Sequence, residues 1–200
     1  MLDVLHAGSL DLWRLNYGVI ILTPKLKLPN TIKQFSPICL LNIIYKIITK
    51  VLTRRLSPVA SRVINSNQIA FIPGGNILDG VVILHEVLHS LHSKKEKGII
   101  LKLDFDKAYD RVSWSFLEEV LRTRNLSSIW IDWIMKSVRD GRVAIDINGE
   151  RGDFFKSFRG LRQGDPLSPL LFNFVGDALS AMICAASNAG DIVGVTSDLV

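Results

Sequence analysis

Acidic residues gather in one short stretch, the sequence LKLDFDKAYD at residues 101–110. The apolar run at residues 99–103 predicts a buried strand, with Asp104 at its carboxyl end on a rigid support. Asp104 and Asp106 share a face if the strand continues, because side chains alternate along a strand. Carboxylates grouped in this way suit Mg²⁺, a hard cation that prefers oxygen ligands.

A second stretch that could bind a ligand is GLRQGDPLSP at residues 160–169. Gly160 and Gly164 permit close approach of the backbone, and a predicted helix begins directly afterwards. Gln163 offers both a donor and an acceptor, which is useful against the edge of a base or a sugar.

Both stretches also have ordinary structural interpretations. Asp106 caps a turn in that case, and Asp110 pairs with Lys107 or Arg111. The glycine-rich stretch is then a loop that ends in a helix cap, with Asp165 as the capping residue.

A different enzyme class is indicated by His85-Glu86-Val-Leu-His89, which satisfies the H-E-x-x-H pattern of zinc proteases. On a helix the two histidines share a face at one-turn spacing. The third ligand is missing, since His92 stands where a metzincin has glycine and Lys95 where it has histidine. A zinc metalloprotease therefore remains a remote alternative.

Taken together, the motifs resemble the reverse transcriptases of non-LTR (LINE-type) retrotransposons, the plant-type elements in particular. KLDFDKAYDRV (102–112) and RGLRQGDPLSPLLF (159–172) are similar to the first two palm motifs of that family. NQIAFIPG (67–74) resembles its fingers motif, and residues 11–20, 21–25 and 35–40 match its amino-terminal fingers. The resemblance covers nearly the whole chain, and motifs in this order are far more specific than any one alone.

The resemblance implies a role for individual residues. Asp104 matches the first catalytic aspartate, which binds both metal ions, and the backbone carbonyl of Phe105 matches a second contact to one ion. Tyr109 matches the aromatic gate that rejects a ribose 2′-hydroxyl. Gln163 and Gly164 match positions beside the nascent base pair, so that Phe105, Tyr109, Gln163 and Gly164 are the expected nucleotide-binding residues.

The implied activity is that of an RNA-directed DNA polymerase, which adds deoxynucleotides to a primer by two-metal phosphoryl transfer. The implied cofactor is Mg²⁺, with two ions in the complete site. The implied partners are an RNA template, a DNA primer and deoxynucleoside triphosphates, and no membrane is expected. The resemblance places the protein in the nucleus or the cytoplasm and leaves its oligomeric state open.

The chain also departs from the family pattern. The Tyr-x-Asp-Asp hairpin that completes the family site does not occur in the sequence, so we expect a fragment that is inactive as an isolated chain. Ser36 and Gly75 stand where the family usually has arginine, and neither replaces its fork of phosphate-binding donors.

The order of predicted elements is mixed, which indicates an α+β fold, and the resemblance implies the fingers and incomplete palm of a right-hand polymerase. Residues 1–98 are the predicted fingers and residues 99–200 the predicted partial palm. Helices are predicted at 41–64, 77–93, 114–122, 128–139 and 167–186, strands at 17–22 and 99–103, and a hairpin at 143–158 with its turn at Asn148-Gly149. Pro58 is expected to break the first helix.

Composition adds weaker constraints. The net charge of +5 and pI of 9.3 are compatible with a polyanionic partner, so a non-catalytic basic remnant that binds nucleic acid is the main alternative. The basic face of the first long predicted helix also supports this alternative. Cys39 and Cys184 form no CxxC pair and are expected to be small buried side chains. No uninterrupted apolar run approaches the roughly 18 residues of a membrane helix.

Overall fold

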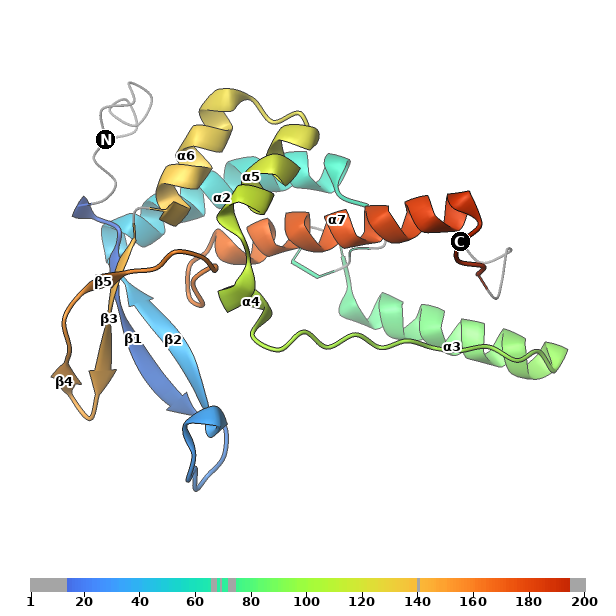
Figure 1. The fold of residues 1–200 in the computed structure, drawn as a ribbon, viewed down its shortest axis with the longest axis horizontal. Coiled ribbons are helices and arrows are strands. Elements are labelled where there is room, and N and C mark those ends of the chain that lie inside the picture. The colour runs from blue at the N-terminus through green and yellow to red at the C-terminus, as the bar shows by residue number, and fades with distance from the viewer. Residues whose placement is uncertain (1–13, 66–67, 69, 72–74, 140, 195–200) are drawn as a thin grey trace.

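The computed structural model describes residues 14–65, 68, 70–71, 75–139 and 141–194. It has a small sheet at one end and a layer of helices beside it (Figure 1). In chain order the elements are β1 (Tyr17–Pro24), the 3₁₀ turn η2 (Ile32–Gln34), β2 (Phe35–Leu41), α2 (Ile43–Val63), α3 (Ile77–Lys94), α4 (Ala108–Arg111), α5 (Trp114–Thr123), α6 (Ser128–Arg139), β3 (Arg142–Ile147), β4 (Glu150–Arg151), β5 (Phe155–Lys156) and α7 (Ser168–Ala189). The predicted α+β class is confirmed.

The sheet joins strands that are far apart in the sequence. Its order is β2-β1-β3-β4, and β5 also pairs with β3. β1 is antiparallel to β2, with Ile20 opposite Cys39, and parallel to β3, with Ile20 opposite Ile145. Strands from both sides of residue 98 therefore share one sheet, and the division into fingers and palm at that residue stays a prediction.

The predicted turn at Asn148-Gly149 is confirmed. Both residues have positive φ, 56° and 86°, as a two-residue hairpin turn of this kind requires. The Gly149 N–H donates to the Asp146 side chain at 2.9 Å, and Asp146 pairs with Arg151 across the turn. The return strand is short, because β4 ends at Arg151 and pairing to β3 resumes only at Phe155.

The core lies where α2, α5, α6 and α7 meet. Its most deeply buried apolar side chains come from all four helices: Leu52, Leu56 and Ala60 of α2, Leu117 and Leu121 of α5, Ile134 of α6, and Leu171 and Phe174 of α7. Each leucine, isoleucine or phenylalanine among them contributes about 1.5–3 kcal/mol when buried. This cluster fixes the helices that carry the candidate site.

The expected break at Pro58 does not occur, and α2 runs through this residue to Val63. Pro58 is exposed, while Leu56 and Ala60 on either side of it are buried in the core. Their burial offsets the helical hydrogen bond that proline cannot donate. At its other end α2 is capped by Asn42, whose side chain accepts from the Ile44 and Tyr45 N–H groups.

The predicted strand at residues 99–103 was wrong. The segment has no strand assignment, and Ile99 and Leu101 are 90% and 77% exposed. A strand is stabilised by pairing with a neighbour, and no strand of the described part of the chain lies beside this one. Asp104 therefore follows an exposed, extended segment rather than a buried strand.

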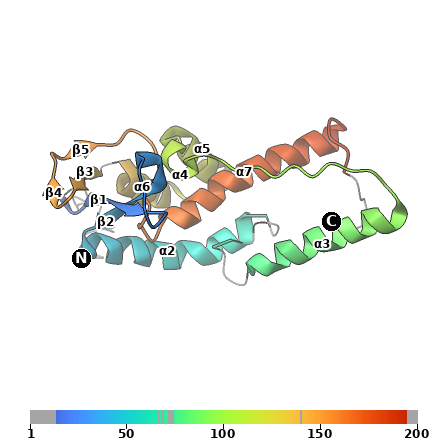
Figure 2. The same cartoon turned by 90° about the horizontal axis from the view of Figure 1, so that it is seen from below.

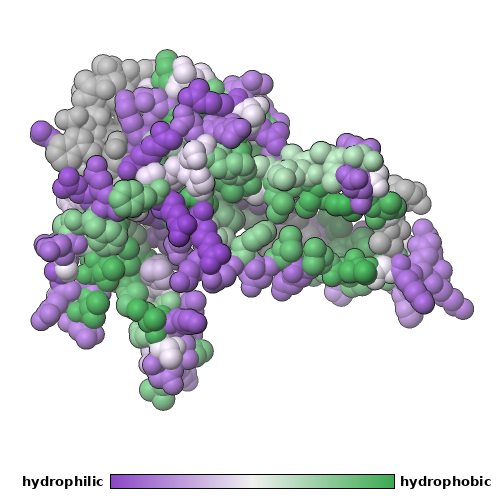
Figure 3. All heavy atoms as spheres, in the orientation of Figure 1, coloured by the Kyte–Doolittle hydropathy of each residue, from purple (hydrophilic) through white to green (hydrophobic). Residues whose placement is uncertain are grey.

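The helix at 77–93 was predicted correctly, but its inward face was not. The apolar period predicts that Val81, Leu84, Leu88 and Leu91 face inward, but the first three are exposed and only Leu91 is buried. Figure 3 shows apolar side chains along the facing sides of α7 and α3, in the right-hand part of the molecule. Periodicity identified the apolar face, but most of that face is exposed.

Helix α7 combines a buried half with an exposed half. Cys184 is exposed, against the expectation that it is buried, and Met182 is exposed as well. With 22 residues and a hydropathy of 1.6 over its most apolar window, α7 is long and apolar enough to cross a membrane, which the sequence interpretation had excluded. The helix nevertheless packs in the core and buries the polar side chains of Asn173 and Asp177. The core helix of a globular domain meets the same criterion.

Candidate functional site

The two motif segments predicted to form a site are joined directly by their backbones. The Leu161 N–H donates to the Tyr109 carbonyl, and the Gly160 N–H donates to the Val112 carbonyl, both at 2.8 Å. The indole N–H of Trp114 donates to the Gly160 carbonyl, also at 2.8 Å. Short helix α4 and the loop before α7 therefore form one rigid unit.

The two glycines permit the close approach that the sequence predicted. A Cβ on Gly160 would lie 2.9 Å from the Asp110 carbonyl oxygen, and one on Gly164 would lie 2.6 Å from the Cys39 carbonyl oxygen. Both glycines have positive φ, at 90° and 107°. The Cys39 N–H donates to the Gln163 carbonyl at 2.9 Å, which fixes the loop against β2.

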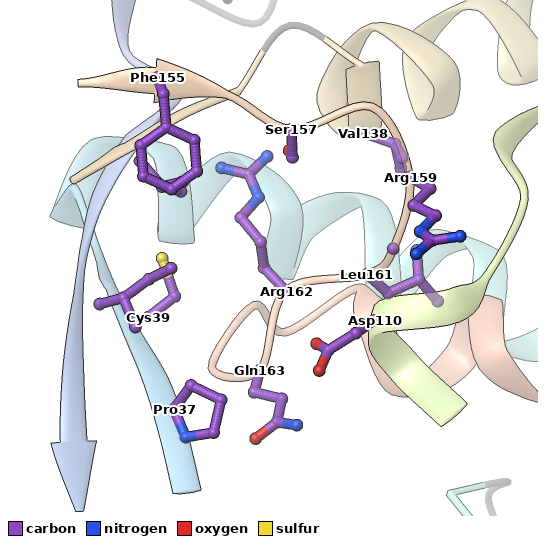
Figure 4. Close-up of a pocket in the computed structure, with 13 residues that line it drawn as sticks. Pro37, Cys39, Asp110, Val138, Phe155, Ser157, Arg159, Leu161, Arg162 and Gln163 are labelled. Atoms are coloured by element: carbon purple, nitrogen blue, oxygen red, sulfur yellow. The ribbon is translucent and has the colours of Figure 1, made fainter. Parts of the chain in front are cut away.

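Gln163 and Asp110 line a pocket between this loop, α4 and β2. Figure 4 shows both side chains at the same end of the pocket, with Pro37 of β2 beside Gln163. The pocket volume is about 160 Å³. That is below the roughly 300 Å³ at which small-molecule sites begin, so in this conformation it admits the edge of a ligand and not a whole nucleotide.

Tyr109 packs against the helix that follows the loop. Its ring stacks on that of Phe172, with centroids 4.8 Å apart and an interplanar angle of 17°. The side chain is half-buried, and this burial raises the pKa of the Tyr109 phenol. The hydroxyl therefore stays protonated at neutral pH, in an orientation that the stack holds.

Asp104 and Phe105 are not brought into the pocket. Both are exposed in the extended segment before α4, and neither lines the cavity beside Gln163. Asp106 lies 3.5 Å from Arg111 in an exposed ion pair, so Arg111 pairs with Asp106 and not with Asp110. Within the ranges that the structure describes, no group of three or more His, Cys, Asp or Glu side chains could hold a metal ion. These residues alone do not fit a two-ion site.

The H-E-x-x-H pattern likewise gathers no metal site. His85, Glu86 and His89 are all exposed on α3, and among the described residues no group of metal ligands lies around them. The structure thus gives the zinc protease no support.

Arg162 is a site residue that the sequence interpretation did not single out. Its Nη2 donates to the Ser137 carbonyl at 2.8 Å and to the Tyr45 hydroxyl at 3.2 Å, and its guanidinium lies 5.1 Å from the centre of the Tyr45 ring. The Ser137 carbonyl also accepts from the Tyr45 hydroxyl at 2.6 Å and from the Asn16 amide at 2.9 Å. Arg162 therefore ties the loop to the carboxyl end of α6, where a positive charge is favourable.

Burial also shifts the pKa of Asp165, the acidic residue at the end of this loop. Asp165 is 7% exposed, and burial raises the pKa of its carboxyl, against the opposing effects of the Leu167 N–H, Arg162 and Lys46. Its oxygen accepts from the Leu167 N–H at 3.0 Å. The predicted cap by Asp165 was wrong, because α7 begins at Ser168 with Leu167 at the N-cap position and without a side-chain cap hydrogen bond, and the bond from Asp165 fixes the turn before the helix.

Two polar residues of α7 hold the segment that follows α2. Asp177 accepts from the Asn65 N–H at 2.8 Å and forms an ion pair with Arg124. Asn173 donates to the Ala70 carbonyl at 2.6 Å and accepts from Gln68 at 3.1 Å. The expected fingers motif at residues 67–74 lies largely outside the described residues, but these contacts fix the parts of it that the structure describes.

Comparison with known proteins decides the family. The family described as reverse transcriptase (RNA-dependent DNA polymerase) matches residues 24–192, which include both motif segments. The chain belongs to the reverse transcriptase family. The resemblance that the motifs indicate is thereby confirmed, while the assignment of its parts to fingers and palm stays a prediction.

Retrotransposon proteins are among the relatives of this reverse transcriptase chain. It is 30% identical over 167 residues to the uncharacterized 149 kDa protein of transposon TX1 from Xenopus laevis, covering 84% of this chain and 12% of that protein. It is 30% identical over 138 residues to the Pol polyprotein of the type-2 retrotransposable element R2DM from Drosophila melanogaster, covering 66% of this chain and 13% of that protein. The non-LTR assignment is confirmed, and the plant-type assignment stays a prediction.

The chain spans about an eighth of the length of these two relatives. Among solved structures it is similar to an apo telomerase of Candida tropicalis truncated from its C-terminal domain, with 14% identity and a TM-score of 0.47, covering 84% of this chain and 39% of that one. Reverse transcriptases as a family use divalent metal ions and bind nucleic acid and deoxynucleotides.

Proposed function

We propose that this chain supplies part of the nucleotide site of an RNA-directed DNA polymerase, which extends a primer on an RNA template. The observation that carries the proposal is the joining of the two motif segments through Tyr109 and Leu161, beside a pocket lined by Gln163. Two segments separated by some fifty residues of sequence are held in one rigid unit, as the placing of a substrate requires.

Each residue has a proposed task in this reaction. The Gln163 side chain and the Gly164 backbone contact the nascent base pair, since the absence of a Cβ lets the chain come close. The Tyr109 ring, fixed by its stack on Phe172, occupies the space that a ribose 2′-hydroxyl would need. Asp104 and the Phe105 carbonyl are the proposed metal contacts.

The metal site needs more than these residues. Two Mg²⁺ ions, when bound, supply charge that activates the primer hydroxyl and neutralises the leaving pyrophosphate. One carboxylate cannot hold two ions in the required geometry, and the described residues provide no second group. We therefore propose that the isolated chain of 200 residues does not extend a primer, and that additional carboxylates complete the site in a longer protein.

Primer extension tests the proposal. The assay uses Mg²⁺, four deoxynucleotides and an RNA template, with the isolated chain and with a longer protein that also holds a Tyr-x-Asp-Asp segment. The longer protein should extend the primer, and Asp104→Asn should remove nearly all of that activity, because the amide loses the charge that binds the ions. Asp106→Asn, at an exposed neighbour, is the matched control and should keep activity. An active Asp104→Asn variant would refute the assignment.

The alternative function is a non-catalytic module that binds nucleic acid. The observation that favours it is the lack of a metal-ligand group within the described ranges, together with the basic net charge. A longer protein that binds RNA in a salt-dependent manner, yet never extends a primer, would support this alternative.

A further inference from the structure

Arg162 and Gln163 are neighbours in the loop before α7, yet their side chains leave it in different directions (Figure 4). Gln163 extends to the end of the pocket where Asp110 and Pro37 also lie. Arg162 extends into the protein, toward the carboxyl end of α6. The residue that faces the proposed nucleotide is therefore adjacent to one that is anchored inside the fold.

The guanidinium of Arg162 lies in a seat formed by Tyr45, Ser137 and Gly141. Its Nη2 donates to the Ser137 carbonyl at 2.8 Å and to the Tyr45 hydroxyl at 3.2 Å, and the group lies over the Tyr45 ring. Gly141 leaves the space that the group needs, because a Cβ at this position would lie 2.9 Å from the guanidinium carbon. Figure 2 shows α2, which carries Tyr45, along the lower edge of the molecule below the sheet and α6. The seat therefore joins the loop to α2, to α6 and to the residue before β3.

The seat itself is buried and internally bonded. Tyr45 and Ser137 are 0% and 1% exposed. The Tyr45 hydroxyl donates to the Ser137 carbonyl at 2.6 Å, and burial raises the pKa of the phenol, so it keeps its proton. The same oxygen accepts from Arg162 with a remaining lone pair. Because each contact comes from a fixed element, the seat holds the attached loop in one place.

Gln163 depends on its neighbours for its position. Its side chain makes no hydrogen bond within the described part of the chain, and its backbone carbonyl accepts from the Cys39 N–H at 2.9 Å. On the other side of Gln163, Asp165 is fixed by the Leu167 N–H. Arg162 is the neighbour whose side chain attaches the loop to α2 and α6. A shift of Arg162 is therefore passed to the Gln163 backbone and changes where the amide lies.

We propose that Arg162 is a positioning residue, which acts through Gln163 to set the affinity of the polymerase for the incoming nucleotide. Arginine suits this task, because a planar guanidinium bonds to two acceptors while it lies over an aromatic ring, whereas the ammonium of lysine is a compact point charge. In this assignment Arg162 contacts no substrate itself. The inference rests on the proposed function, since it takes Gln163 as a contact of the nascent base pair.

Nucleotide kinetics of the longer protein that holds a Tyr-x-Asp-Asp segment test the inference. Arg162→Lys should raise the KM for deoxynucleotides about tenfold and change kcat by less than about twofold, because a displaced Gln163 weakens binding before and during the reaction alike. Gly141→Ala should give the same result with Arg162 intact, since the added methyl group excludes the guanidinium from the seat. An unchanged KM in both variants would overturn the inference.

Two matched controls separate the position of the loop from general stability. Arg139→Lys changes another arginine at the end of α6, one that pairs with Glu118 of α5 instead of holding the loop. Gly152→Ala adds a methyl group in ordinary contact, 3.6 Å from the Ile145 carbonyl oxygen. Both controls should keep KM within about twofold of the parent value. A rise in either control equal to that of Arg162→Lys would overturn the inference.

A double-mutant cycle shows whether Arg162 acts through Gln163. Gln163→Ala removes the amide and should raise KM by itself. Adding Arg162→Lys to it should raise KM by less than about twofold further, because the contact that Arg162 positions is already gone. If Arg162→Lys raised KM by the same factor with and without the Gln163 amide, Arg162 would act by another route and the inference would fail.

The position of the loop can be measured without catalysis in the 200-residue chain. Cys39 is buried beside the loop, and with Cys184→Ser it is the only thiol in the sequence. Arg162→Lys and Gly141→Ala should speed its reaction with a disulfide reagent about fivefold, and Arg139→Lys should not, with stabilities compared by urea denaturation. Equal rates in all variants would refute the inference and leave the polymerase proposal standing. A faster reaction, together with a longer protein that never extends a primer, supports the placing of the loop by Arg162 and refutes the proposed function instead.

Discussion

Gly160 approaches Asp110 so closely that a Cβ at position 160 would lie 2.9 Å from the Asp110 carbonyl oxygen and 3.0 Å from its Cα. The obstacle is backbone, which cannot rotate away as a long side chain can. The same glycine donates its N–H to Val112 and accepts from the Trp114 indole. This contact joins the segment that holds Tyr109 to the segment that holds Gln163.

Gly160→Ala should therefore destabilise the chain by about 2–4 kcal/mol, from overpacking and from the positive φ. Urea denaturation measures the loss. Gly149→Ala is the control, because it has a similar φ of 86° with nothing within 4 Å of its added Cβ. It should cost only about 1 kcal/mol. Equal losses in the two variants would show that the contact with Asp110 contributes nothing.

Asp177→Ala should destabilise the chain by about 2–3 kcal/mol, because it removes the buried partner of Arg124 and the acceptor for Asn65. The estimate is below the usual cost of breaking a buried pair, since the Arg124 side chain is 31% exposed and can be hydrated. Asp132→Ala breaks the exposed pair with Lys136 and should cost at most about 0.5 kcal/mol. Similar losses in both would contradict the assigned burial.

Asp165 should make stability depend on pH. Because burial raises its native pKa above the unfolded value, the native state holds the proton more tightly. Its contribution is then fully present below about pH 4, the unfolded pKa, and is lost as pH rises through the native pKa. Asp165→Asn keeps an oxygen that accepts from Leu167 and should gain stability relative to the parent over that rise. Parallel stability curves from pH 4 to pH 7 would contradict the raised pKa.

The two thiols should react at different rates. Cys184 is exposed, whereas Cys39 is buried and burial raises the pKa of its thiol. In the folded chain a disulfide reagent at neutral pH should modify Cys184 at least about tenfold faster. Gly164→Ala should speed the reaction of Cys39, because the added Cβ would lie 2.6 Å from its carbonyl oxygen and displace β2. An unchanged Cys39 rate would show that the loop gives way instead.

Tyr109→Val should admit ribonucleotides more readily in the longer protein, provided that the proposed polymerase function holds. The ratio of kcat/KM for deoxynucleotides to that for ribonucleotides measures the discrimination. Tyr109→Phe is the matched control, since it keeps the ring and its stack on Phe172 and should keep the discrimination. Equal ratios in the valine variant and the parent would reject the gate.

The sequence by itself determined the family and most of the helices. The order of the motifs indicated the family, and local signals such as the apolar period of α2 indicated the helices. Gly160 and Gly164 also predicted close backbone contacts, although the sequence did not show which residues they contact. All of these are properties of neighbouring residues.

The tertiary structure decided which surfaces meet. Periodicity gave α3 an apolar face that is mostly exposed, and the apolar run at 99–103 remains unpaired because a strand depends on a partner elsewhere in the chain. The Ser137 carbonyl collects donors from Asn16, Tyr45 and Arg162, residues that lie far apart in the sequence. Such contacts form between distant segments only after the chain has folded, and no local pattern specifies them.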